Sequence, residues 1–247
     1  MKKRFVSFAL ALIWILALSC PALAANETTS GDLASTILTS VRYKLRNTSQ
    51  TPWTDAELLD YLNDGVRKTI YRTKCVEQVQ QTVLDTGTSE YAISAASPFV
   101  SITDVWYQSG ATTFKGLEYN KRLLKGHEDK DTAHPEYYAV EYGKVIPFPM
   151  KDTADETVTG NTIYIFFTPL QSALVSGTTI PTPGTLDESL VYYVTAHAWF
   201  SVHRPDLAMT FLGMYEAELQ RYEQQHTNRP IESRWQLLAE QADLTPK

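Results

Sequence analysis

The segment from residue 51 to residue 75, TPWTDAELLDYLNDGVRKTIYRTKC, limits most strongly what this chain can fold into. Thr54 is followed three residues later by Glu57, the spacing of a capping box, in which each side chain accepts a hydrogen bond from the other residue's backbone N–H. Trp53 precedes the cap and Leu58 takes the fourth helical position, as in a hydrophobic staple. The segment therefore predicts a helix whose apolar stripe is Leu58, Leu62, Val66 and Ile70.

Four helices are predicted in all, at residues 33–46, 54–74, 185–202 and 205–226. Residues 29–32, and Thr185 with Glu188, have the composition of two further caps. The first helix has the stripe Leu33, Ile37, Val41 and Leu45, and the third has Leu186, Leu190, Val194 and Ala198. The fourth starts at a proline and should bury Leu207, Phe211, Tyr215, Leu219 and Tyr222.

The middle of the chain, residues 78–169, is rich in Val, Ile, Thr, Tyr and Phe and is broken at short intervals by turn residues. This pattern predicts strands, with a hairpin turn at Glu141-Tyr142-Gly143-Lys144. The expected strands are 78–84, 91–94, 100–108, 113–118, 137–142, 144–148 and 162–168. The predicted fold class is therefore α+β, a helical bundle from the N- and C-terminal helices with an inserted, mostly antiparallel β region.

Residues 1–24 have the features of a secretory signal peptide: a basic start, an apolar run over residues 5–19, and the small residues Ala22 and Ala24 at a cleavage site. That run is shorter than the ~20 residues that a spanning helix needs, so no stable membrane anchor is expected. The predicted organisation is a leader at 1–24, a helical unit from 25–76 and 185–228, an inserted β region with its linker at 77–184, and a C-terminal tail at 229–247.

The chain is acidic, with a formal net charge of -6. Cleavage of the leader removes Lys2, Lys3 and Arg4, so Lys plus Arg falls from 22 to 19 against 28 acids, and the net charge becomes -9. Binding to phosphates needs clustered Lys and Arg. We therefore expect no sequence-specific nucleic-acid binding.

Residues with catalytic or metal-binding chemistry occur only in weak combinations. His197 and His203 lie six residues apart near Asp206, whereas zinc pairs on a helix prefer spacings of three or four. Cys75 follows the C-terminus of a predicted helix, and the negative end of the helix dipole disfavours a thiolate. Acidic groups could serve a glycosidase or bind calcium, but solvated loop carboxylates are the more common case; they are Asp129, Asp131, Asp152, Asp155 and Glu156. We expect no enzyme, no cofactor and no metal.

Two features suit a protein partner instead. The ends of the first two helices are basic, and the tail carries an apolar cluster outside any predicted core. The candidate partner-binding residues are Arg42, Arg46, Arg67, Arg72, Trp235, Leu237 and Leu238. The alternatives are that the basic residues stabilise the helix dipoles and that the tail packs on its own domain.

The stretch Trp53–Asn63, WTDAELLDYLN, resembles the head–tail connector (adaptor) proteins of tailed bacteriophages. The resemblance extends over about residues 32–75 and 135–225. Its later part rests on Pro135-Glu136-Tyr137-Tyr138, Ile146-Pro147-Phe148-Pro149, residues 163–169 and residues 190–193.

This resemblance implies a structural virion protein that joins the portal ring to the tail and has no enzymatic activity. Its partners would be portal and tail proteins, and it would form a closed ring that is about twelve-fold. The leader supports an alternative, an exported periplasmic or secreted α+β protein that is a binding module or a hydrolase.

The leader can be tested directly. Residues 1–30 fused to a periplasmic reporter should direct secretion, because the basic start and the apolar run suit the export machinery. N-terminal sequencing of the exported fusion should find Ala25 first. A fusion that stays in the cytoplasm with Met1 intact would contradict this prediction.

Overall fold

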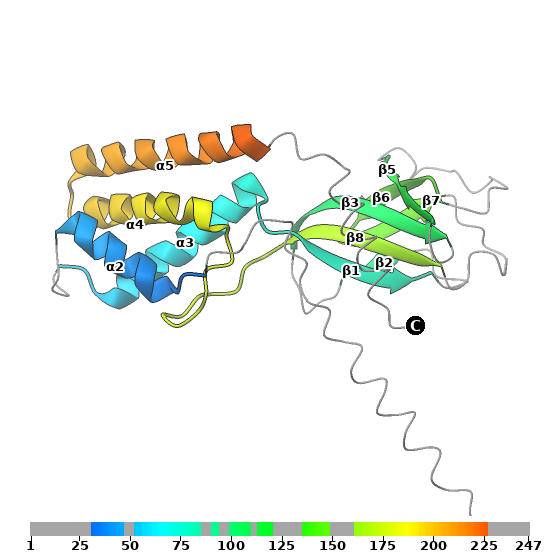
Figure 1. Cartoon of the computed structure of the whole chain (residues 1–247), viewed down its shortest axis with the longest axis horizontal. Helices are drawn as coiled ribbons and strands as arrows, with labels where there is room; N and C mark the ends of the chain where they lie inside the picture. The colour runs from blue at the N-terminus through cyan, green and yellow to red at the C-terminus, as the bar shows by residue number, and fades with distance from the viewer. Residues whose placement is uncertain are drawn as a thin grey trace, which may run out of the picture.

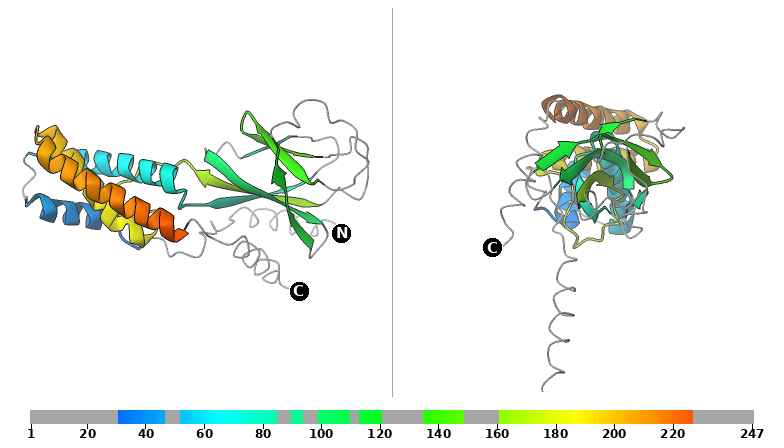
Figure 2. Two further views of the ribbon diagram at one scale, coloured as in Figure 1. Left: turned by 90° about the horizontal axis from the view of Figure 1, so that it is seen from above. Right: turned by 90° about the vertical axis from the view of Figure 1, so that its right-hand side faces the viewer.

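The computed structural model describes residues 31–46, 52–84, 90–93, 99–109, 113–120, 135–148 and 161–226. In this part of the chain the helices gather at one end of an elongated molecule and the strands at the other (Figure 1). The view from above shows the same separation (Figure 2). Two connections join the ends, one leading from helix to strand at residues 74–77 and one returning at residues 170–183.

The helical end combines segments from both halves of the sequence. The helices are α2 (Ala34–Leu45), α3 (Asp55–Thr73), α4 (Asp187–Ser201) and α5 (Pro205–His226), and the 3-10 turn η3 (Gly184–Leu186) precedes α4. Helix α4 contacts α2, α3 and α5. The predicted α+β class, with a mostly antiparallel β part, is confirmed.

Helix α3 begins as its sequence predicts. The backbone N–H of Glu57 donates to Thr54 Oγ1 (3.2 Å), and the backbone N–H of Thr54 donates to Glu57 Oε2 (2.8 Å). Trp53 is buried, and its indole Nε1 donates to the carbonyl of Ala198 (2.8 Å). The same N–H also donates to Ser201 Oγ (3.0 Å), so a local cap and two long-range hydrogen bonds fix where α3 starts against the end of α4.

Helix α2 is not capped by its own sequence. Its N-cap residue is Leu33, and the N–H groups of Ala34 and Ser35 donate to carbonyls of Thr178 and Ser176, at 2.9 and 3.0 Å. The predicted cap at residues 29–32 lies partly outside the described residues, and neither Gly31 nor Asp32 takes that role. Leu33 is 41% exposed, so the buried stripe starts later than predicted, because Leu33 bridges to Thr179 at the surface.

The return connection is part of the helical unit. Leu174 and Ile180 are buried in the same apolar cluster as α2, α3 and α4. The Asn63 side chain holds the backbone of Leu174 on both sides, because Oδ1 accepts from its N–H (2.6 Å) and Nδ2 donates to its carbonyl (3.3 Å).

The predicted capping box of Thr185 and Glu188 is wrong. Helix α4 begins after η3 without a side-chain cap, and the Glu188 carboxylate accepts instead from Tyr192 Oη (2.7 Å) and Lys44 Nζ (3.2 Å). The single predicted stripe is also too narrow, because α4 lies between three other helices. Its buried residues are Ser189, Leu190, Val191, Tyr193, Val194, Thr195, Ala196 and Ala198.

Helix α5 is the outer helix, and only its second half follows the prediction closely. Tyr215, Leu219 and Tyr222 are buried, whereas Leu207 and Phe211 are half-buried. Ala208 takes the buried position near the start of the helix, because a small side chain there allows α5 to turn back onto α4.

The strands form two sheets. The first has the antiparallel order β1 (Gln78–Val83), β8 (Thr162–Pro169), β3 (Phe99–Ser109) and β4 (Thr113–Gly116). The second has the order β2 (Tyr91–Ala92), β7 (Lys144–Phe148), β6 (Tyr137–Glu141) and β5 (Glu118–Tyr119), in which only the β5–β6 pair is parallel. The single strand predicted at 113–118 is split between the sheets, because the chain crosses from one to the other at Leu117.

The β core lies between the two sheets. Val105, Ile163 and Ile165 of the first sheet pack in one cluster with Tyr138 and Val145 of the second. Strand β8 is buried along its whole length. The predicted hairpin between β6 and β7 is present, and its two turn residues have positive φ values, 48° at Tyr142 and 77° at Gly143, as a type I′ turn requires.

The approach of α3 to α4 can be tested at Gly65. A Cβ there would lie 2.7 Å from Tyr193 Cδ1, so Gly65→Ala should destabilise the protein by about 1–3 kcal/mol. Gly213→Ala is the matched control, because a Cβ in that part of α5 meets nothing within 4 Å and should stabilise by up to ~1 kcal/mol. Urea unfolding monitored by circular dichroism gives both values, and equal stability of the two variants would contradict the close contact.

Candidate partner-binding surfaces

Arg42 is used inside the helical unit. Its Nε donates to Asp55 Oδ1 (2.9 Å), and its Nη2 donates to the carbonyl of Trp53 (3.2 Å). The Arg42 side chain is mostly buried by these contacts, whereas Asp55 remains exposed. Arg42 therefore ties the last turn of α2 to the start of α3.

Arg72 ties α3 to α5 in the same way. Its Nε donates to Glu223 Oε1 (2.8 Å), and its Nη1 donates to Glu216. The hydrogen bonds that Arg72 donates to Glu223 and Glu216 raise the pKa of its guanidinium above its ordinary value. Two carboxylates about two turns apart on α5 thus hold one cation, an arrangement that orients the two helices.

Arg46 and Arg67 are different, because both are exposed and neither forms an ion pair with another residue in the described part of the chain. Arg46 is the left-handed C-cap of α2, with φ 51°. The end of α2 lies away from the strands, whereas α3 ends beside β1 (Figure 1). The four predicted arginines therefore do not form one basic patch.

The other predicted partner-binding residues, Trp235, Leu237 and Leu238, fall outside the described residues, which end at His226. The structure does show where their segment begins. Helix α5 ends on the side of the helical unit that faces the strands (Figure 1).

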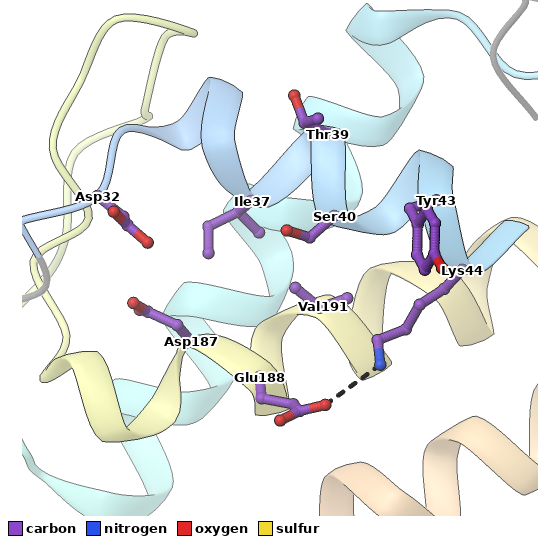
Figure 3. Close-up of a pocket in the computed structure, with 9 residues that line it drawn as sticks. All are labelled: Asp32, Ile37, Thr39, Ser40, Tyr43, Lys44, Asp187, Glu188 and Val191. Carbon is purple, nitrogen blue, oxygen red and sulfur yellow. Dashed lines mark hydrogen bonds and ion pairs between the residues drawn. The ribbon is translucent and has the colours of Figure 1, made fainter.

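A groove of about 520 Å³ lies between α2 and α4. Figure 3 shows Lys44 reaching across it to Glu188. Hydrogen bonds from Tyr192 and Lys44 lower the pKa of the Glu188 carboxyl. This groove was not predicted, because residues far apart in the chain line it: Asp32, Ile37, Thr39, Ser40, Tyr43, Lys44, Asp187, Glu188 and Val191.

A polar cluster lies at the contact of α3 with α4. Tyr193 Oη donates to the Asp64 carboxylate and accepts from Lys68 Nζ (2.6 Å), while Lys68 pairs with Asp64 at 2.9 Å. Burial and the Asp64 contact raise the pKa of Tyr193. Burial opposes ionisation of Asp64, but the bonds from Tyr193 and Lys68 outweigh it and lower its pKa. These bonds tie α3 to α4 at this point.

The histidines do not form a metal pair. The His197 ring stacks on Tyr193, with centroids 4.3 Å apart, and also lies near Tyr61, whereas His203 is an exposed turn residue. Cys75 packs against two apolar clusters. No group of three or more metal-ligating side chains occurs among the residues that the structure describes. The acidic residues predicted at 129–131 and 152–156 lie outside that part of the chain.

None of the helices in the described ranges is both long enough and apolar enough to span a bilayer.

The half-buried His197 should make stability depend on pH. Burial, and then the charge of Lys68, lower the pKa of His197 below 6.5, although Asp64 works in the opposite direction. As pH falls below 6.5 the unfolded chain gains a proton that the folded protein does not, so stability should fall. Thermal melts between pH 7 and pH 5 should show a smaller loss for His197→Asn than for the native chain. The control His203→Asn should keep the native slope, and equal slopes in all three proteins would contradict this prediction.

Comparison with known protein families agrees with the helical framework described above. A family model described as SU10 adaptor protein matches residues 33–235, which spans both helical segments and the β region between them. No curated protein matches the chain. The match covers most of the 247 residues, and the chain belongs to the SU10 adaptor protein family, a family of phage head–tail adaptors.

Proposed function

We propose that this protein joins the portal ring to the tail in a phage virion, as one subunit of a closed ring that is about twelve-fold. The observation that carries the proposal is the family match, which covers the helical and β parts together. Phage adaptors are structural proteins, so the proposed role needs no catalytic centre. A virion location follows from the same role.

The geometry supports such an assembly in one respect. Arg42 and Arg72 are occupied within the subunit, which leaves Arg46 and Arg67 as the exposed arginines of the predicted set. They lie on α2 and α3 of a chain whose net charge is negative. In a head-to-tail ring, exposed cations on one subunit would meet acidic surface on the next, and this complementarity would set the register.

We assign Trp235, Leu237 and Leu238 to contact with the portal. An aromatic anchor flanked by leucines suits insertion into a pocket of a partner, where a few large apolar side chains provide most of the binding energy. The residues follow α5, so the contact would be made by an extension of the helical unit.

The signal-peptide-like residues 1–24 favour a second candidate, an exported periplasmic or secreted binding protein or hydrolase. The two candidates differ in assembly. An adaptor must bind a portal ring, whereas an exported hydrolase must turn over a glycan or a peptide.

Size-exclusion chromatography with light scattering on the chain mixed with its cognate portal tests the proposal. A complex with about one adaptor per portal subunit is expected at micromolar concentration. Arg46→Glu and Arg67→Glu should lower the number of adaptor subunits bound per portal, because they reverse the exposed charges proposed to join neighbouring subunits. Lys115→Glu is a charge-reversal control on β4 and should not lower this number, although it also removes the ion pair of Lys115 with Glu136. Absence of any complex, together with hydrolysis of a glycan or peptide, would refute the adaptor role.

A further inference from the structure

The first sheet carries an aromatic face on the side away from the second sheet. Val105 and Ile165 point into the core between the sheets, so their neighbours Trp106 and Phe166 point the opposite way. The register agrees, because Trp106 lies opposite Tyr164. The aromatic face, as we define it, consists of Trp106, Phe114, Tyr164 and Phe166.

The aromatic face is as well buried as the core. Its four members are 2%, 7%, 8% and 6% exposed, in the order given. Within the described residues, the cluster that they form comes from the first sheet alone, with Val79 of β1 beside it. The outer face of a sheet cannot shelter four aromatic rings by itself, so a further layer must cover it.

The polar atoms of this face bond within the sheet. Trp106 Nε1 donates to Asp104 Oδ2 (2.9 Å), and Tyr164 Oη donates to Gln108 Oε1 (2.7 Å). Burial also raises the pKa of the Tyr164 hydroxyl. The ring surfaces therefore suit an apolar cover with large side chains.

The C-terminal segment after His226 could cover the aromatic face, because it contains large apolar residues and starts on the side of the helices that faces the strands. Twenty-one residues follow His226, where α5 ends facing the strands (Figure 1). The nine residues to Trp235 can extend about 30 Å. As a strand the segment would place Leu237 on the same side as Trp235, and as a helix it would place Leu238 there. The internal segments outside the described part, 121–134 and 149–160, contain no Phe, Trp or Tyr. Residues 1–30 contain Phe5, Phe8 and Trp14, but these lie in the leader that we expect to be removed.

We propose that residues 231–238 cover the aromatic face of the same chain, with Trp235 as the central anchor. This contact exists in the isolated subunit and does not depend on the proposed function. If the same residues contact the portal, residues 231–238 must leave the aromatic face of their own chain when they bind the portal.

Hydroxyl-radical footprinting of the full-length chain tests this contact, because it measures the solvent exposure of single side chains. In the variant W235A/L237A/L238A, oxidation of the aromatic face should rise several-fold, most clearly at Trp106. Trp53, buried in the helical unit, should not change. Trp235→Phe should retain the native pattern, and Leu244→Ala is the matched control for a tail substitution outside the contact.

Unchanged oxidation of the aromatic face in the triple variant would overturn the proposal. So would increased oxidation confined to the helices, since the tail would then pack on α4 or α5. Protection that is lost on dilution of the native chain would assign the cover to a second copy and would also overturn it. Portal binding is measured separately by light scattering, so failure of the internal contact and failure of the adaptor role are distinguished.

Discussion

The helical unit depends on the burial of α4 among three neighbours. Helix α4 meets α2, α3 and α5, and the contact with α3 is close enough that only glycine fits opposite the Tyr193 ring. Trp53 fixes one end of this contact through its bond to Ala198. A helix that packs on three neighbours is stable only when those neighbours are present, so the N-terminal and C-terminal segments of the chain do not form separate bundles.

The need to keep the helices together also explains why two of the predicted arginines form ion pairs within the subunit. Arg42 and Arg72 hold α2 to α3 and α3 to α5 at the edges of the bundle, where apolar packing ends. Ion pairs at the surface contribute little when single, but a guanidinium held by two carboxylates on one helix also fixes geometry. Two of the four predicted arginines thus serve the fold, whereas Arg46 and Arg67 remain exposed.

The sequence alone predicted what is encoded locally. The start of α3 is set by Thr54 and Glu57 three residues apart, and the α+β class follows from periodicity. The predictions from sequence were wrong where a residue far away in the chain determines a helix start or a side-chain contact. Glu188 bonds Lys44, which lies 144 residues away, instead of capping α4, and carbonyls of the return connection bond the start of α2. The groove between α2 and α4 and the aromatic face were not predicted, because neither has a signature within one segment.

The two connections between the units have a mechanical consequence. One leads into the start of β1 and the other leaves the end of β8, and these strands are hydrogen-bonded neighbours, with Gln78 opposite Phe167. The return connection is anchored by Asn63 and by its buried Leu174, so little of its length is free to move. Two chains side by side resist torsion about the long axis more than they resist flexure across it. The strands should therefore be able to bend relative to the helices, which changes the angle between the two ends of the molecule. Rotation of the strands about the long axis relative to the helices should be restricted.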